Sequence, residues 1–110
     1  MNNEENYFIY RLRLSPKYQN GKNWTNSTQE TIQEHVNFLN ELGNQGKLIF
    51  AGRTDLDLGN ENQFGIALIL AHSQKEAEEM MAKDPGVEAG IHLSEVYPFR
   101  LAISHFKNII

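Results

Sequence analysis

The sequence predicts an α+β domain with four strands and two helices. Two stretches of alternating apolar and polar side chains, about residues 6–14 and 91–103, are typical of strands with one solvated face. Two capping boxes, Ser27 to Glu30 and Ser73 to Glu76, each precede apolar residues at helical spacing. The predicted order is strand, helix, strand, strand, helix, strand. Two right-handed crossovers then place both helices on one face of a four-stranded antiparallel sheet, which is the ferredoxin-like arrangement.

The first half of the chain supplies one strand and one helix. Ser15 and Pro16 end the first strand, and the polar residues 16–26 predict a loop. The helix that follows the first capping box carries an apolar stripe, and Gly43 and Gly46 signal its end. The stripe consists of Ile32, Val36, Phe38, Leu39 and Leu42.

The second half of the chain supplies the remaining three strands and the second helix. A short apolar run, residues 47–51, predicts a second strand, and the polar residues 53–63 predict a hairpin loop. The most continuous apolar run, residues 64–71, is typical of a central strand buried on both faces. Asp84-Pro85-Gly86 ends the second helix, and Pro98, which has no amide donor, suits either an edge strand or a bulge.

Length and composition bound the class of protein. The chain has 110 residues, which we assign to one domain, residues 1–110. Ten Lys and Arg against fourteen Asp and Glu give a net charge of −4, which argues against a nucleic-acid binder. The absence of cysteine excludes disulfides and thiolate chemistry. The longest apolar run, residues 66–71, is too short to cross a membrane, and the acidic start is unlike a secretion signal, so we predict a cytoplasmic protein.

His35 is the strongest candidate for chemistry. It lies three residues after Ile32 and four before Leu39, so it points along the apolar stripe of the first helix. One interpretation is a core histidine that has found a hydrogen-bond partner. The other is an acid–base group, because an imidazole in a partly apolar cleft suits proton transfer. The second interpretation needs a carboxylate that orients the ring and stabilises its charged form.

Three aspartates are candidates for that carboxylate. Asp55 and Asp57 follow the second strand, where turn chemistry is the alternative explanation for them, and Asp84 follows the second helix, where it could simply end the helix. Arg53, at the end of the second strand, could bind a carboxylate or phosphate, or could pair with an acidic neighbour in its own loop.

Cofactors and partners are predicted as follows. The remaining histidines, His72, His92 and His105, show no metal-ligand spacing, and no phosphate-binding glycine motif is present, so we predict neither a metal nor a cofactor. The outer strands carry too many apolar side chains for a solvated sheet face. A second copy of the chain would cover that face, and we therefore predict a homodimer that packs sheet against sheet.

The chain resembles the YCII-related (YciI-like) family over about residues 7–103, the core of the predicted domain. The helical histidine together with an Asp-Pro-x-x-x-x-Gly element carries most of the resemblance. The matching segments are His35, residues 42–46, 48–52, 73–77 and 84–90, and Pro98-Phe99-Arg100. The resemblance implies a ferredoxin-like fold, similar to that of muconolactone isomerase, that dimerises as an α/β barrel.

The resemblance also implies an acid–base site built from a His–Asp pair. Carried over by position, the histidine is His35, and its partner is Asp55 or Asp57, with Asp84 a competing choice. Two departures from the family pattern, Arg53 in place of a proline and a long loop at residues 15–26, would reshape the mouth of the pocket.

Two hypotheses about function follow. The first is a small-molecule enzyme of isomerase, lyase (dehydrochlorinase) or hydrolase type, with His35 as acid or base, Asp55 orienting it, and Arg53, Asp57 and Asp84 available to the ligand. Arg53 would attract an anionic group. The alternative is a module that binds a small ligand, or a partner, without turning it over.

Overall fold

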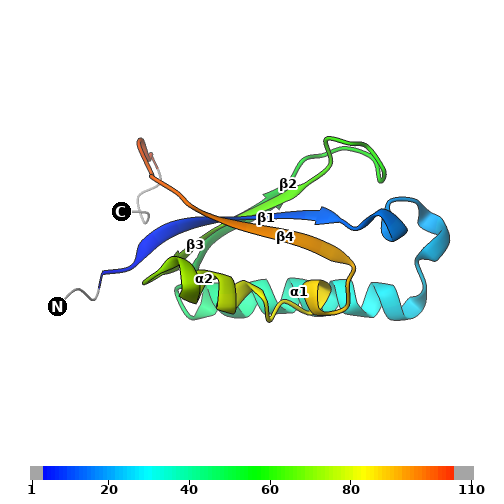
Figure 1. Cartoon of the computed structure of the whole chain (residues 1–110), viewed down its shortest axis with the longest axis horizontal. Coiled ribbons are helices and arrows are strands. Elements are labelled where there is room, and N and C mark those ends of the chain that lie inside the picture. The colour runs from blue at the N-terminus through cyan, green and yellow to red at the C-terminus, as the bar shows by residue number, and fades with distance from the viewer. Residues whose placement is uncertain (1–3, 106–110) are drawn as a thin grey trace.

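A computed structural model describes residues 4–105 of the chain (Figure 1). Four strands and three α-helices alternate along it, with two short 3₁₀ turns before the first helix. In chain order these are β1 (Asn6–Leu14), η1 (Pro16–Tyr18), η2 (Gly21–Asn23), α1 (Asn26–Asn44), β2 (Leu48–Arg53), β3 (Gly65–Ala71), α2 (Gln74–Met81), α3 (Pro85–Glu88) and β4 (His92–Pro98).

The strands form one antiparallel sheet in the order β2-β3-β1-β4. The two central strands are the first and third, and Tyr10 of β1 lies opposite Ala67 of β3 and Val96 of β4. All helices lie on one face of this sheet, and Figure 1 shows the other face without a covering layer. The predicted ferredoxin-like fold is therefore confirmed.

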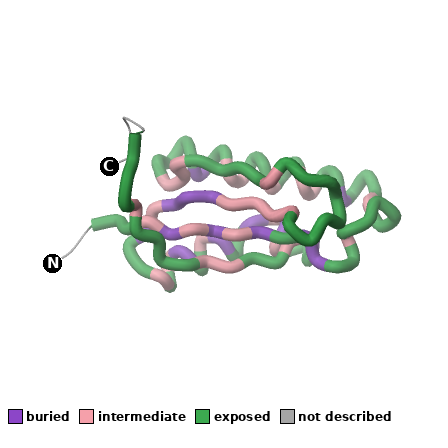
Figure 2. The backbone as a smooth tube through the Cα atoms, turned by 90° about the horizontal axis from the view of Figure 1, so that it is seen from above, coloured by how far each residue is buried: buried purple, intermediate pink, exposed green. Residues whose placement is uncertain are grey.

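The core lies between the sheet and the helices. Every second residue of β1 points into it, which is why Phe8, Tyr10 and Leu12 are at most 8% exposed. Ile69 of β3 and Met81 of α2 fill the same layer. Figure 2 shows the buried positions concentrated along the strands. The burial of alternate residues matches the period of two that predicted the first strand.

The cap of α1 differs from the predicted one. The helix starts two residues earlier, with Thr25 as N-cap: its Oγ1 accepts the amide of Thr28 at 3.2 Å, and Thr28 Oγ1 accepts the amide of Thr25 at 3.1 Å. Ser27 is exposed, whereas Thr28 is buried, and a buried hydroxyl needs a hydrogen-bond partner. The prediction at Ser73 is confirmed, since Ser73 Oγ accepts the amide of Glu76.

The last strand is shorter than predicted. It ends at Pro98 rather than near residue 103, because proline has no amide to continue the ladder. One further contact, Phe99 N to Tyr7 O at 3.0 Å, closes the pairing with β1. The strand is an edge strand, which is one of the two alternatives that Pro98 left open. At the opposite edge, β2 extends two residues past the predicted end and includes Arg53.

The face of the sheet opposite the helices, called the outer face below, mixes apolar and charged side chains. Phe50, Leu93 and Tyr97 are 41–47% exposed there. Arg11 and Glu95 form an ion pair of 2.8 Å between neighbouring strands. Among the described residues, no helix has both the length and the apolar character needed to cross a membrane.

The position of the α1 cap can be tested by stability measurements. Replacing Thr25 with Ala removes the oxygen that accepts the Thr28 amide, so we expect T25A to lower the free energy of unfolding by about 1 kcal/mol. S27A removes only an exposed hydroxyl and should leave the urea midpoint nearly unchanged. If S27A lowered the free energy of unfolding more than T25A does, Ser27 rather than Thr25 would be the N-cap.

Candidate active site

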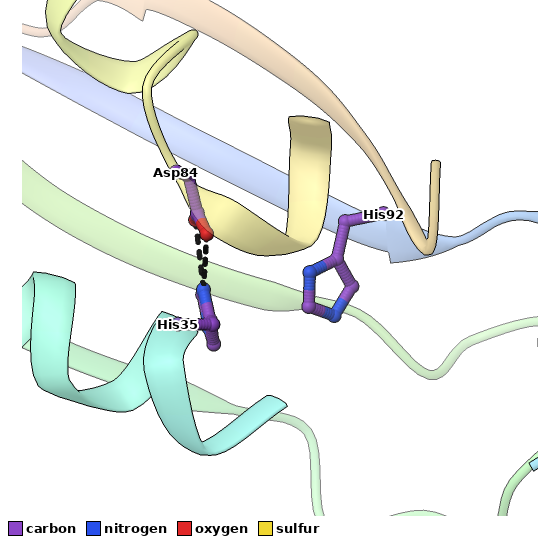
Figure 3. Close-up of side chains that lie close together, drawn as sticks. All are labelled: His35, Asp84 and His92. Carbon is purple, nitrogen blue, oxygen red and sulfur yellow. Dashed lines mark hydrogen bonds and ion pairs between the residues drawn. The ribbon is translucent and has the colours of Figure 1, made fainter. Parts of the chain in front are cut away.

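The imidazole of His35 and the carboxylate of Asp84 are in direct contact (Figure 3). Nδ1 of His35 lies 2.7 Å from Oδ2 and 2.9 Å from Oδ1 of Asp84. The two residues are 49 positions apart, on α1 and at the start of α3, and these helices pack against each other. The His35 side chain is 13% exposed and that of Asp84 is fully buried. The carboxylate therefore holds Nδ1 in its protonated form and leaves Nε2 as the nitrogen that can take up a proton.

Three groups satisfy the buried carboxylate. Besides His35, the hydroxyl of Tyr10 donates to Oδ2 at 2.8 Å, and the amide of Gly86 donates to Oδ1 at 2.9 Å. Asp84 is the N-cap of α3, with Pro85 in the first turn, so the local sequence aims its side chain at the Gly86 amide. Because every donor comes from a rigid element, the carboxylate is fixed in orientation.

These contacts shift the pKa values of Asp84 and Tyr10. Burial raises the pKa of Asp84, but the hydrogen bond and positive charge of His35, together with the Tyr10 hydroxyl and the Gly86 amide, outweigh it and hold that pKa below its ordinary value. Burial, and next the negative charge of Asp84, raises the pKa of Tyr10 far above its ordinary value. Asp84 is therefore a carboxylate at neutral pH, and Tyr10 is a permanent donor to it.

A second imidazole lies beside the pair. The ring centroids of His35 and His92 are 4.8 Å apart, with the ring planes inclined by 58°. His92 opens β4, and its ring occupies the space next to Gly86, where a Cβ atom would lie 2.2 Å from Nδ1. Among the described residues, that buried Nδ1 has no hydrogen-bond partner. Burial, and next the positive charge of His35, lowers the pKa of His92 to about 4, so its imidazole is neutral at physiological pH.

The three side chains have the donor atoms of a metal site. His35, Asp84 and His92 each offer one ligand atom, and these atoms lie within 4.8 Å of one another. However, the carboxylate oxygens already accept three hydrogen bonds, one of them from His35. A metal ion that bound Nδ1 of His35 would have to displace the proton of that nitrogen. The arrangement is better matched to proton transfer, in which that hydrogen bond is kept.

Both histidines open onto a cleft of about 920 Å³ between α1 and the sheet. Its walls are mainly apolar, and the end away from the histidines is bounded by Trp24 and by the loop between β2 and β3. Three side chains around it, Val36, Leu56 and Leu58, are 39–42% exposed. A cleft of this size and lining suits a small molecule with an apolar body.

The cleft also contains the other residues that the sequence singled out. Arg53, Asp55 and Asp57 line it on the β2 side. The carboxylate that contacts His35, however, is that of Asp84, and this corrects the choice of Asp55 as the orienting group. The physical reason is position: Asp55 and Asp57 are exposed on the hairpin loop, while α3 carries Asp84 into the core against His35.

Two residues of the site were missed from the sequence. Tyr10 lies within the alternating stretch of residues 6–14 and is not singled out by the sequence, although its hydroxyl donates to Asp84. His92 was set aside because it showed no ligand spacing. No sequence signal pointed to it, because the space beside Gly86 that its ring fills is defined only by the structure.

The comparisons with known proteins identify the family and the fold of the chain. Residues 12–100 match the model of the YCII-related domain, and the chain belongs to that family. A comparison with curated proteins finds no match. Among solved structures, the chain is similar to 5-chloro-2-hydroxyhydroquinone dehydrochlorinase (TftG) from Burkholderia phenoliruptrix AC1100, in complex with 2,5-dihydroxybenzoquinone. The TM-score is 0.62 at 17% identity, covering 86% of this chain and 93% of that one, which shows a shared fold.

The depressed pKa of His92 predicts how stability depends on pH. Between its ordinary value of 6.5 and about 4, the unfolded chain binds more protons at this residue than the folded chain does. The free energy of unfolding therefore falls as the pH falls through that window, by at most about 1.4 kcal/mol per pH unit from this group. We expect the free energy of unfolding of H92Q to depend less steeply on pH between 6.5 and about 4 than that of the wild type.

Urea unfolding at a series of pH values checks the expectation, with H72Q as the matched control, because His72 is exposed and bonds only to the backbone of Glu4 through its ring. The carboxylate of Asp84 acts in a different window: its stabilisation is present above its ordinary pKa of 3.8 and is lost as the pH falls through its lower folded value. Identical slopes for the wild type and H92Q between pH 6.5 and 4 would contradict the burial of a neutral His92.

Proposed function

We propose that the protein is a small-molecule enzyme in which His35 acts as general base and then as general acid, oriented by Asp84. The contact of 2.7–2.9 Å between His35 Nδ1 and a fully buried carboxylate is the observation that carries the proposal. A histidine that served only as core packing would not need an open cleft, whereas His35 lines one.

The chemistry is proton abstraction. Nε2 of His35 takes a proton from a carbon or hydroxyl next to an unsaturated bond of the ligand. The freed electron pair moves toward a neighbouring carbonyl oxygen, or forms a new double bond and expels a leaving group with its own bonding pair. In the first case His35 returns the proton at another carbon, giving an isomer. In the second, the net loss is one proton and one anion, such as chloride. Asp84 stabilises the imidazolium throughout.

Elimination has additional support from the structural neighbour, which is named a dehydrochlorinase and holds a hydroxylated quinone. The cleft of the present chain offers apolar side chains for a ring, and Arg53 for an anionic oxygen. No hydrogen bond or ion pair joins the Arg53 side chain to another of the described residues. We therefore propose a small cyclic or aromatic acid, or an enol of similar acidity, as the ligand class.

We further propose that two chains associate through the outer face. The exposed side chains of Phe50, Leu93 and Tyr97 lie there, on a sheet face that no helix covers. A cytoplasmic location remains a prediction from the sequence.

The acid–base role of His35 is tested with two probes related to the neighbour's ligands. We expect the protein to release chloride from 5-chloro-2-hydroxyhydroquinone, and to accelerate deuterium exchange at the ring carbons of 2,5-dihydroxybenzoquinone, followed by NMR. H35Q should lower both rates about 10²- to 10⁴-fold, because it removes the group that accepts the proton. H72Q, at an exposed histidine, should leave them unchanged. Equal rates for H35Q and wild type would overturn the mechanism, and binding without either reaction would favour a ligand-binding module.

The role of Arg53 is tested by the affinity for 2,5-dihydroxybenzoquinone, whose hydroxyl groups are acidic. Removing the charge in R53Q should weaken binding several-fold in calorimetry, and the difference should shrink at high salt. Arg100 provides the control, since it lines a separate cleft at the opposite end of the sheet and R100Q should bind like the wild type. If R53Q and R100Q bind alike, Arg53 does not contact the ligand.

The dimer is tested by sedimentation. The wild type should have the mass of two chains, and L93K should shift the mass toward one chain, because it places a buried positive charge in the interface beside Arg13 of the paired strand. Ile103, which is 79% exposed and outside the sheet, supplies the control variant I103K. A wild type that sediments as a single chain at micromolar concentration would exclude this assembly.

A further inference from the structure

We propose that His92 is a second catalytic residue of this site, whose neutral imidazole donates its Nε2 proton in a hydrogen bond to the ligand oxygen on which negative charge develops. This inference rests on the proposed acid–base role of His35 and adds a group with the opposite task. His35 removes a proton, and His92 stabilises the anion that remains.

The position of His92 is the first support. Its ring lies 4.8 Å from that of His35, and both rings line the same cleft. A ligand atom that gives its proton to His35 therefore has His92 as its neighbour. Figure 3 shows the imidazole of His92 standing beside the His35–Asp84 pair and joined to neither residue by a hydrogen bond. The ring is thus close enough to act on the same ligand without competing for Asp84.

The surroundings of Nδ1 decide which nitrogen carries the proton. Nδ1 is buried and has no hydrogen-bond partner within the part of the chain that the structure describes. It also lies so close to Gly86 that a Cβ atom there would be 2.2 Å away. A buried N–H without an acceptor is among the rarest features of folded proteins, and an unsatisfied lone pair is less costly. The proton of the neutral ring is therefore on Nε2, which leaves Nε2–H as the donor.

The charge state is the second support. The charged groups that act on the His92 ring are His35 of α1 and Asp84 at the start of α3, and the ring also lies beside Gly86. Burial, and next the positive charge of His35, lowers the pKa of His92 to about 4. A group with a pKa of about 4 is a weak proton acceptor near pH 7, so the imidazole of His92 stays neutral and does not take the role of the base. It remains a donor while His35 gains and returns its proton.

A base at His35 and a hydrogen-bond donor at His92 together restrict the chemistry of the ligand. The ligand must carry an oxygen, either a carbonyl or an enolic hydroxyl, one or two bonds from the atom that loses the proton. When the electron pair shifts to that oxygen, the hydrogen bond from Nε2–H strengthens, and the proton of His92 is not transferred. A ring that presents this oxygen to His92 and its body to the apolar wall fits the cleft.

The tautomer is measured on the free protein, without any ligand. In long-range ¹H–¹⁵N NMR spectra of histidine-labelled protein at pH 7, assigned by comparison with H92Q, we expect Nε2 of His92 to have the shift of a protonated ring nitrogen and Nδ1 that of a lone-pair nitrogen. The pattern should persist down to about pH 5. A protonated Nδ1, or a charged ring at pH 7, would overturn the proposal.

The catalytic role is measured with H92F, which keeps a ring but has no donor, and with H92Q, which restores one. H92F should lower kcat for chloride release or deuterium exchange about 10²- to 10³-fold while the affinity for 2,5-dihydroxybenzoquinone changes little, and H92Q should recover part of the loss. Thermal unfolding checks that both variants are folded. A residue with only a structural role would not lower kcat while leaving the affinity for the ligand unchanged.

The outcomes separate this inference from the proposed function. If His35-dependent turnover occurs and H92F retains the wild-type kcat, the role of His92 is refuted and that of His35 stands. If the wild type reacts with neither probe, the proposed function and the catalytic role of His92 both fail. An H92F variant that loses kcat and affinity in equal proportion assigns His92 to ligand binding only, which also refutes the proposal.

Discussion

The carboxylate of Asp84 accepts hydrogen bonds from a strand, a long helix and the first turn of a short helix. Tyr10 is 74 residues away in sequence and His35 is 49 away, so this one side chain ties β1 and α1 to the start of α3. A carboxylate with no exposed surface is destabilising by several kcal/mol when it lacks partners, and removing one partner leaves that penalty exposed. The orientation of His35, and with it any proton transfer, depends on this set of contacts remaining complete.

Gly86 serves two parts of the site at once. Its amide satisfies one oxygen of Asp84, and the absence of a side chain leaves the space that the His92 ring fills. Each of the three residues Asp84-Pro85-Gly86 has a different role. Asp84 caps the helix and carries the charge, Pro85 favours the first helical turn, and Gly86 leaves space for the imidazole. The same motif that predicted a helix end therefore builds most of the site.

The mouth of the cleft is shaped by two loops that touch. Gly59, in the loop between β2 and β3, has a φ of +88°, and a Cβ there would lie 2.6 Å from the carbonyl oxygen of Gln19 in the first loop. The length of the first loop and the presence of Arg53, the two departures from the family pattern, both affect this end. These loop residues bound one end of the cleft, and His35 and His92 line it together beside Asp84.

The sequence by itself determined the layers of the fold, because a period of two in β1 and a period of 3.6 in α1 each place apolar side chains on one face. It also singled out His35, since a histidine in an apolar stripe is costly unless it is partnered or used. It could not choose between Asp55, Asp57 and Asp84, since that choice depends on how α3 packs on α1, across 49 residues of chain. His92 was likewise decided only by tertiary structure: burial beside a second imidazole and against Gly86 makes the ring neutral, and no local pattern encodes that environment.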